Sequence, residues 1–460
     1  MKEYRKMNHI HKKIFLFTVI SFLISVSAKA ETIFEAMTDA YNTNPILHGQ
    51  RATSGIANEQ AALARSGFRP TVAVSADYTD SHVRNTGDKT RDGHAKGYKG
   101  SVSQSLFSGF QTYNSVKSAD SNAKAGINVL YSVEQNILLN AATAYLNVVR
   151  DEAIVKLQKN NENLLKKQLE ETLARLEVGE VTRTDVAQSR ASYARAQSDL
   201  ISAQGNLAIS KDAYLRIVGK EPQKVSFPEN LQNLFPTEMN SALNYAKANN
   251  YTYLAAQKSL KAAKYNVKSQ EGALLPEVRF TAASGKNQSS SPLSAKDPST
   301  TSTTYTVDMS MPLYTGGATR ANIRKSKYQR WQAQEALQEA EREVVSGVTA
   351  NWEMMQTSKS NISAIKEQVK ASAIALEGTQ KEEALGNRTV LDVLNAYQTL
   401  LSSQVNEVQA RHDYYVAGLQ LMQSMGKLTA QKLNLKVDYY DAEANYRNTR
   451  NKWLSLSIDK

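Results

Sequence analysis

The chain has 460 residues, no cysteine and a formal net charge of +12. Without cysteine it cannot form disulfide bonds, a thiolate metal site or a cysteine nucleophile, so its stability must come from packing and association. The basic residues are spread along the chain rather than gathered in a stripe, which argues against nucleic acid as a partner.

Residues 1–30 have the pattern of a cleaved secretory signal. Basic residues lead into an apolar run from Ile14 to Val26, and Ala28 and Ala30 occupy the small positions that a signal peptidase requires. The run is short for a permanent membrane helix, so a retained anchor is the weaker alternative. We therefore expect the mature protein to begin at Glu31. Cleavage there removes six basic residues and one acidic residue and lowers the net charge to +7.

The rest of the chain is a duplication of one unit of about two hundred residues. At an offset of 207 positions, Gly179 and Asp185 correspond to Gly386 and Asp392, and upstream of the first strands the offset is 206. This period is far longer than a solenoid repeat, so we expect two copies of one large structural element.

Each copy predicts the same order of elements: a helical segment, a strand pair, a long helical hairpin and a connecting segment. In the first copy these are residues 31–70, 71–110, 111–218 and 219–237. In the second copy they are residues 238–275, 276–316, 317–425 and 426–460.

Alternation of apolar and polar residues predicts the strands. The stretches between paired strands, Asp80–Gly97 and Ser284–Thr303, are polar and are expected to be exposed loops. After residue 30 no apolar stretch reaches the roughly 20 residues of a membrane helix, so a membrane location would require a β-barrel. A soluble hairpin with one wet face is an equally open interpretation. The apolar positions that alternate are Val72, Val74, Ala76 and Tyr78 in the first copy, and Tyr305, Val307, Met309, Met311 and Leu313 in the second.

Steps of three and four between apolar residues predict coiled-coil helices in the hairpins, which no proline interrupts. The turns read "VGEVTRTDV" and "LGNRTVLDV". Each places a glycine where a helix ends. Thr182 and Thr389 then stand at the N-cap of the returning helix, with Asp185 and Asp392 three residues later, as in a capping box. Capping alone would explain both acids, and that interpretation stays open at this point.

Four strands per chain cannot close a membrane barrel, which needs about eight or more. Open edges in lipid would leave backbone groups unpaired at a cost of several kcal/mol each, so chains must associate. Three chains would supply twelve strands, enough for an aqueous lumen, with the helices continuing below as a coiled-coil tube. The number three is a choice that the residues alone do not force.

The signal, the duplicated strand–strand–long-helix order, "SLFSGF" and "PLYTGG" after the strands, and the paired tip motifs resemble the TolC family of outer-membrane efflux and type I secretion channel proteins. The resemblance covers essentially the whole mature chain. It implies a mixed α and β membrane protein, a homotrimer with a twelve-stranded β-barrel in outer-membrane lipid and a long α-helical coiled-coil tunnel across the periplasm. It also implies two partners, a periplasmic adaptor (membrane fusion) protein and an inner-membrane pump or ABC transporter, and no cofactor.

The resemblance assigns roles to residues at the tips. Asp392 matches an acid whose three copies line the closed periplasmic aperture, whereas Asn395 stands where the family pattern has a second aspartate. Arg388 matches the arginine of a latch that holds the tip closed, with Thr184 and Asp185 as its partners.

One departure from the family pattern affects that latch. Glu383 replaces a tyrosine of the latch, so we expect the latch to be weaker or rewired. The apices expected to dock the adaptor are Val178, Gly179, Glu180, Leu385, Gly386 and Asn387.

Passive exit-duct transport is the function that these features favour. A non-conducting structural or adhesive coiled-coil envelope protein is the alternative, and single-channel conductance would distinguish the two. An enzyme is the third class. His9 and His11 leave with the signal, the other four histidines are scattered, and the sequence has no HExxH, GxSxG or P-loop motif. We therefore expect no catalytic or metal site.

Overall fold

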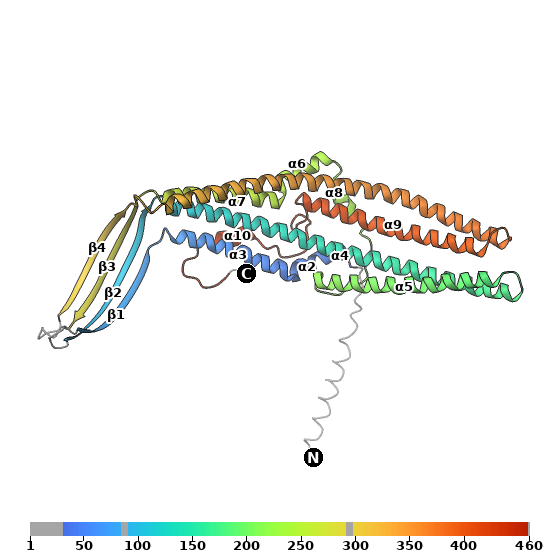
Figure 1. The fold of residues 1–460 in the computed structure, drawn as a ribbon, viewed down its shortest axis with the longest axis horizontal. Coiled ribbons are helices and arrows are strands. Elements are labelled where there is room, and N and C mark those ends of the chain that lie inside the picture. The colour runs from blue at the N-terminus through green and yellow to red at the C-terminus, as the bar shows by residue number, and fades with distance from the viewer. Residues whose placement is uncertain (1–30, 84–90, 291–297, 459–460) are drawn as a thin grey trace, which may run out of the picture. The chain divides into compact units, whose positions relative to one another are not determined.

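The computed structural model describes residues 31–83, 91–290 and 298–458, so the predicted signal lies outside the described residues (Figure 1). The chain forms two compact units. Unit 1 contains the chain up to Thr43 together with Asn140–Leu234 and Ser358–Val416. Unit 2 contains Asn44–Leu139, Phe235–Thr357 and the chain from Ala417 onward.

The helices and strands confirm the predicted duplication, because the equivalent helices, and strands β1 and β3, have equal or nearly equal lengths. The offset is 206 for the first three elements of each copy and 207 for the two helices of each hairpin. The first copy contains α2 (Ile33–Thr43), α3 (Pro45–Ser66), β1 (Thr71–Val83), β2 (Arg91–Ser108), α4 (Gln111–Glu177) and α5 (Arg183–Val218). The second contains α6 (Met239–Asn249), α7 (Tyr251–Gly272), β3 (Glu277–Ser289), β4 (Ser299–Ser310), α8 (Ala318–Ala384) and α9 (Val390–Ser424). The short helix η1 (Leu231–Leu234) and helix α10 (Ala442–Thr449) lie in the connecting segments.

The four strands of unit 2 form one antiparallel sheet in the order β1-β2-β3-β4, so the pairing of β2 with β3 joins the two copies (Figure 1). The register places Val72, Val102, Ala282 and Tyr305 in one row across the sheet. Since side chains alternate between faces along a strand, the predicted apolar positions share one face. In the part of the sheet that the structure describes, β1 and β4 each pair on one side only.

The strands extend further than the sequence predicted, so the loops expected at Asp80–Gly97 and Ser284–Thr303 were wrong in their bounds. Much of both stretches is paired strand. Ser and Thr side chains tolerate extended backbone, and polar groups pair across the strands, as in the 2.9 Å hydrogen bond between the Ser284 and Thr303 hydroxyls. At the other end, β4 stops at Ser310. Met311 and Leu313 therefore lie beyond the strand, because Pro312 has no N–H to continue the ladder.

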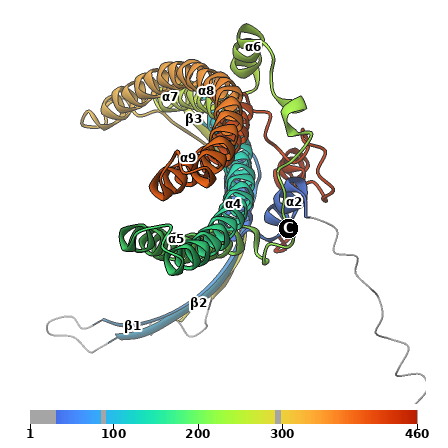
Figure 2. The same cartoon turned by 90° about the vertical axis from the view of Figure 1, so that its right-hand side faces the viewer.

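The long helices fold into two hairpins, α4 with α5 and α8 with α9, which Figure 2 views along the helices. Near the tips, all four helices contribute to one apolar core within unit 1. Among the described residues, no helix combines the length and apolar character needed to cross a membrane. The core contains Leu165, Ala196, Leu376, Val390, Val393, Leu394 and Tyr397.

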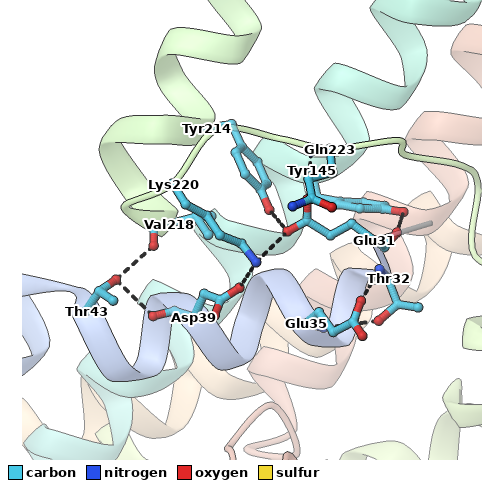
Figure 3. A network of polar contacts seen from close by, with 10 residues as sticks. All are labelled: Glu31, Thr32, Glu35, Asp39, Thr43, Tyr145, Tyr214, Val218, Lys220 and Gln223. Atoms are coloured by element: carbon cyan, nitrogen blue, oxygen red, sulfur yellow. Dashed lines mark hydrogen bonds and ion pairs between the residues drawn. The ribbon is translucent and has the colours of Figure 1, made fainter. Parts of the chain in front are cut away.

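A buried polar network fixes the start of the described chain within unit 1 (Figure 3). The Glu31 carboxylate accepts hydrogen bonds from the Tyr214 hydroxyl at 2.6 Å and from the Gln223 N–H at 2.9 Å. Lys220 pairs with both Glu31 and Asp39. Burial alone would lower the pKa of Lys220, but these two carboxylates raise it above its usual value. The first residue of the expected mature chain is therefore held against the end of the first hairpin.

A second buried carboxylate holds the segment that follows α9 in unit 2. The Glu134 carboxylate accepts a hydrogen bond from the Ala430 N–H at 2.7 Å, and the neighbouring Gln135 accepts one from the Leu428 N–H at 3.2 Å. Burial raises the pKa of Glu134 to about 7, although the Ala430 N–H and the charge of Arg51 oppose the shift.

We expect the 426–435 segment to loosen as the pH rises towards neutrality. The folded-state pKa of Glu134 lies above the ordinary value of 4.5. The contribution of the protonated Glu134 side chain to the free energy of unfolding is therefore complete below pH 4.5, and it is lost as the pH rises through about 7. Hydrogen exchange of this segment, corrected for the intrinsic pH dependence, should show the loss, and Glu134→Gln should remove the pH dependence.

The duplication supplies the control for this measurement. The equivalent residue of the second copy, Glu341, is exposed, so Glu341→Gln should leave the exchange of the 426–435 segment unchanged. If the corrected exchange rate of this segment in the wild type stayed constant between pH 4.5 and about 7, the assignment of Glu134 would be contradicted.

Candidate functional site

The tips of the two hairpins end their outgoing helices in the same way. Gly179 and Gly386 have φ of 81° and 78°, a conformation that side chains with a Cβ rarely adopt. In both tips the glycine N–H donates to the carbonyl three residues earlier, and the next N–H donates to the carbonyl five residues earlier, at 2.9–3.0 Å. This is the Schellman pattern, so the predicted role of both glycines in ending a helix is confirmed.

The returning helices also begin in the same way, as the capping-box spacing predicted. The Asp185 carboxylate accepts from the Thr182 N–H at 2.8 Å, and the Asp392 carboxylate accepts from the Thr389 N–H at 2.9 Å. The threonine hydroxyls accept the reciprocal bonds from the aspartate N–H groups. Hydrogen bonds from Thr182 lower the pKa of Asp185, and those from Thr389 lower the pKa of Asp392. Both acids are therefore caps and are ionised at neutral pH.

An ion pair that was not predicted from the sequence links the two hairpins. Arg175, at the end of α4, donates from Nη1 to Glu383 Oε1 at 2.5 Å and from Nε to Glu180 Oε2 at 3.2 Å. The side chains of Arg175 and Glu383 are 26% and 10% exposed, so the pair is shielded from solvent. The negative charge of Glu383 is therefore balanced by the positive charge of Arg175, and this ion pair joins the end of α4 to the end of α8.

The structure places Arg388 apart from the latch partners that the resemblance implied. Its Nε donates to Glu382 Oε2 at 2.9 Å, and both side chains are about half exposed. Within the described part of one chain, no hydrogen bond or ion pair joins Arg388 to Thr184 or Asp185. An Arg388 latch thus stays a prediction for contacts that one chain alone does not make.

The remaining tip residues are all accessible. The two apolar apices, Val178 and Leu385, are 71% and 77% exposed. Asn395 is exposed one turn beyond Asp392 on α9. The other exposed residues at the apices are Gly179, Glu180, Gly386 and Asn387.

Comparison of the two tips gives the signal that would have identified Arg175. At the offset of 207 it corresponds to Glu382, so the two copies carry opposite charges at this position. A charge reversal between otherwise matching motifs marks a position where the copies have different partners. The partner itself could not be read from the sequence, since Glu383 is 208 residues away.

The sheet offers a second feature that bears on function, because its two faces differ in chemistry. One face carries exposed Val72, Val74, Tyr305, Val307 and Met309. The opposite face is polar and is hollowed by a cavity of about 370 Å³. The polar residues lining that cavity include Asp77, Lys99, Thr281, Asn287, Ser302 and Thr304. In the described ranges, no group of three or more His, Asp or Glu residues is arranged to hold a metal ion.

Comparison with known proteins identifies this combination of elements. The family described as "Outer membrane efflux protein" matches residues 37–220 and 242–427, which fall on the two copies of the duplication. The chain is 34% identical over 434 residues to the outer membrane efflux protein BepC of Brucella suis biovar 1 (strain 1330), covering 94% of each sequence. It is 27% identical over 421 residues to the outer membrane protein TolC of Escherichia coli (strain K12), covering 88% of this chain and 84% of TolC.

A solved structure shows the same fold. The Campylobacter jejuni CmeC outer membrane channel superposes with a TM-score of 0.76 at 15% sequence identity. The match covers 91% of this chain and 89% of that one.

Proposed function

Because the chain belongs to the outer membrane efflux protein family, it is an outer-membrane exit duct of the efflux and secretion class, and we propose that it conducts passively as a homotrimer opened at its periplasmic tip. The observation that carries the proposal is the sheet of unit 2. It has one apolar face, one polar face, and two edge strands whose outer sides are unpaired in the described residues.

Edge pairing between chains would complete this sheet. Unpaired backbone N–H and C=O groups cost several kcal/mol each in lipid, so β1 of one chain should pair with β4 of the next. Three copies of four strands close a ring of twelve, with the apolar face towards lipid and the face of Asp77 and Lys99 towards an aqueous lumen.

The hairpin tips are proposed to form the closed end of the duct. In a trimer, three copies of Asp392 would line the aperture and favour cations, while Asn395 adds no charge to that ring. Within each chain, the Arg175–Glu383 pair is proposed to hold the two hairpins together, so it would take the place of the missing tyrosine in the latch. Arg388 would then act between chains.

Opening requires partners that can pull the hairpins apart. The exposed apices at Val178 and Leu385 are proposed to dock a periplasmic adaptor, which couples the duct to an inner-membrane pump or ABC transporter. Apolar side chains at a solvent-exposed apex are suited to such a contact, because burying each contributes about 1.5–3 kcal/mol.

Purified full-length protein in planar bilayers tests this function directly. We expect a trimer by native mass spectrometry and stable single-channel currents of small, closed-state size. A trimer that inserts but carries no current would favour the non-conducting envelope protein instead.

A further inference from the structure

The last described residues, Trp453–Ile458, form a segment whose large apolar side chains are mostly exposed to solvent. Trp453 is 72% exposed, and Leu454, Leu456 and Ile458 are 92%, 101% and 73% exposed. Single exposed apolar residues are common, but four within six positions are a patch that calls for a partner.

The helix before this segment is fixed to unit 2, so the segment has a defined position. The Tyr446 hydroxyl of α10 donates to Asp120 Oδ1 at 2.8 Å, and Tyr446 itself is buried. Asp120 also pairs with Arg450 at 3.7 Å. One residue before Tyr446 on α10, Asn445 accepts a hydrogen bond from the Asn58 amide at 2.8 Å.

Arg69 then fixes the start of the segment. Its Nη1 donates to the Lys452 carbonyl at 3.1 Å, and its guanidinium lies 4.5 Å from the centre of the Trp453 ring. Arg69 stands two residues before the start of β1, next to exposed Phe68. Trp453, the first residue of the segment, thus lies beside Arg69, just before the start of β1.

We propose that Trp453–Ile458 inserts into the periplasmic leaflet of the outer membrane, at the boundary between lipid headgroups and acyl chains. The proposal rests on the proposed function, since it takes the apolar face of the sheet as facing lipid, and Trp453 lies beside Arg69, two residues before that sheet begins. A tryptophan beside cationic side chains is typical of this boundary. Arg69 and Lys452 place two positive charges at the start of the segment, which suits anionic phospholipid headgroups.

The lack of cysteine in the native chain allows a clean test in the full-length protein in lipid nanodiscs. A bimane fluorophore is attached at Ser455→Cys, and quenching is compared between nitroxide-labelled phospholipid and aqueous iodide. Val74→Cys, on the apolar face of the sheet, reports the proposed function. Asn160→Cys, exposed on α4, reports an aqueous position.

We expect the label at Ser455→Cys to be quenched by the lipid nitroxide as the label at Val74→Cys is, and to be protected from iodide. Replacing Leu454, Leu456 and Ile458 by serine should abolish the lipid quenching at position 455 and leave that at position 74 unchanged. Quenching by iodide to the level of Asn160→Cys would overturn the proposal. So would protection from both quenchers, which would indicate that a second copy of the chain covers the segment. Failure of Val74→Cys to respond to lipid would instead refute the proposed function.

Discussion

Replacing Glu383 by glutamine is expected to raise the single-channel conductance of the protein in planar bilayers. The substitution keeps the size of the side chain but removes the charge that Arg175 contacts at the end of α8. Hydrogen bonds between charged groups contribute about 1.5–3 kcal/mol, and partial exposure of Arg175 reduces this to about 1–2 kcal/mol per chain. Since 1.4 kcal/mol is about tenfold in an equilibrium, each chain should shift the tip several-fold towards the open state.

The adjacent acid provides a matched control. Glu382→Gln removes a charge from the same turn of α8, but its partner Arg388 is about half exposed, so the conductance should change little. The double variant Arg175→Gln with Glu383→Gln should open the tip no more than either single variant, because both remove the same pair. A different result would contradict this prediction. If Glu382→Gln or Arg388→Ser raised the conductance while Glu383→Gln kept the conductance of the wild type, then Arg388 rather than Arg175 would keep the tip closed.

Asp392→Asn is expected to reduce the preference for cations, measured as the reversal potential in a salt gradient. Three carboxylates that converge on an axis create a negative constriction that attracts cations and repels anions. As Asn395 carries no charge, the wild-type preference should be modest, and multivalent cations should block weakly. The loss of the capping hydrogen bonds costs about 1 kcal/mol, too little to unfold the helix.

Asp185→Asn is the control that separates permeation from capping. Asp185 makes the same bonds to Thr182 that Asp392 makes to Thr389, so both variants lose the same local stabilisation. Only Asp392→Asn should change selectivity. Equal reversal potentials in the wild type and Asp392→Asn would reduce Asp392 to a helix cap.

Features that depend on a few neighbouring residues could be predicted from the sequence. The ends of the hairpins follow from Gly179 and Gly386, whose positive φ suits glycine, and from the threonine–aspartate spacing after them. The strands were predicted by their alternation, but their ends were not. Ser and Thr fit both loops and strands, and only the pairing partner decides between them.

Contacts between distant residues could not be predicted in this way. Neither the Arg175–Glu383 pair nor the burial of Glu134 beneath Ala430 has a local signature. Glu134 and its exposed counterpart Glu341 have the same residue type at equivalent positions of the duplication. Their different environments arise from the segment after α9, which covers only one of them.

The duplication has a consequence for stoichiometry. A trimer with two tips per chain would have six apices arranged with approximate sixfold symmetry. The residues at the apices differ between the two copies of the duplication, so the six apices are of two chemical kinds. Val178 and Leu385 are both aliphatic, but Glu180 is anionic where Asn387 is neutral. A ligand that contacted only the aliphatic apices would find six equal positions. A ligand that also recognised charge would distinguish three from the other three, and would fill them in two steps of different affinity.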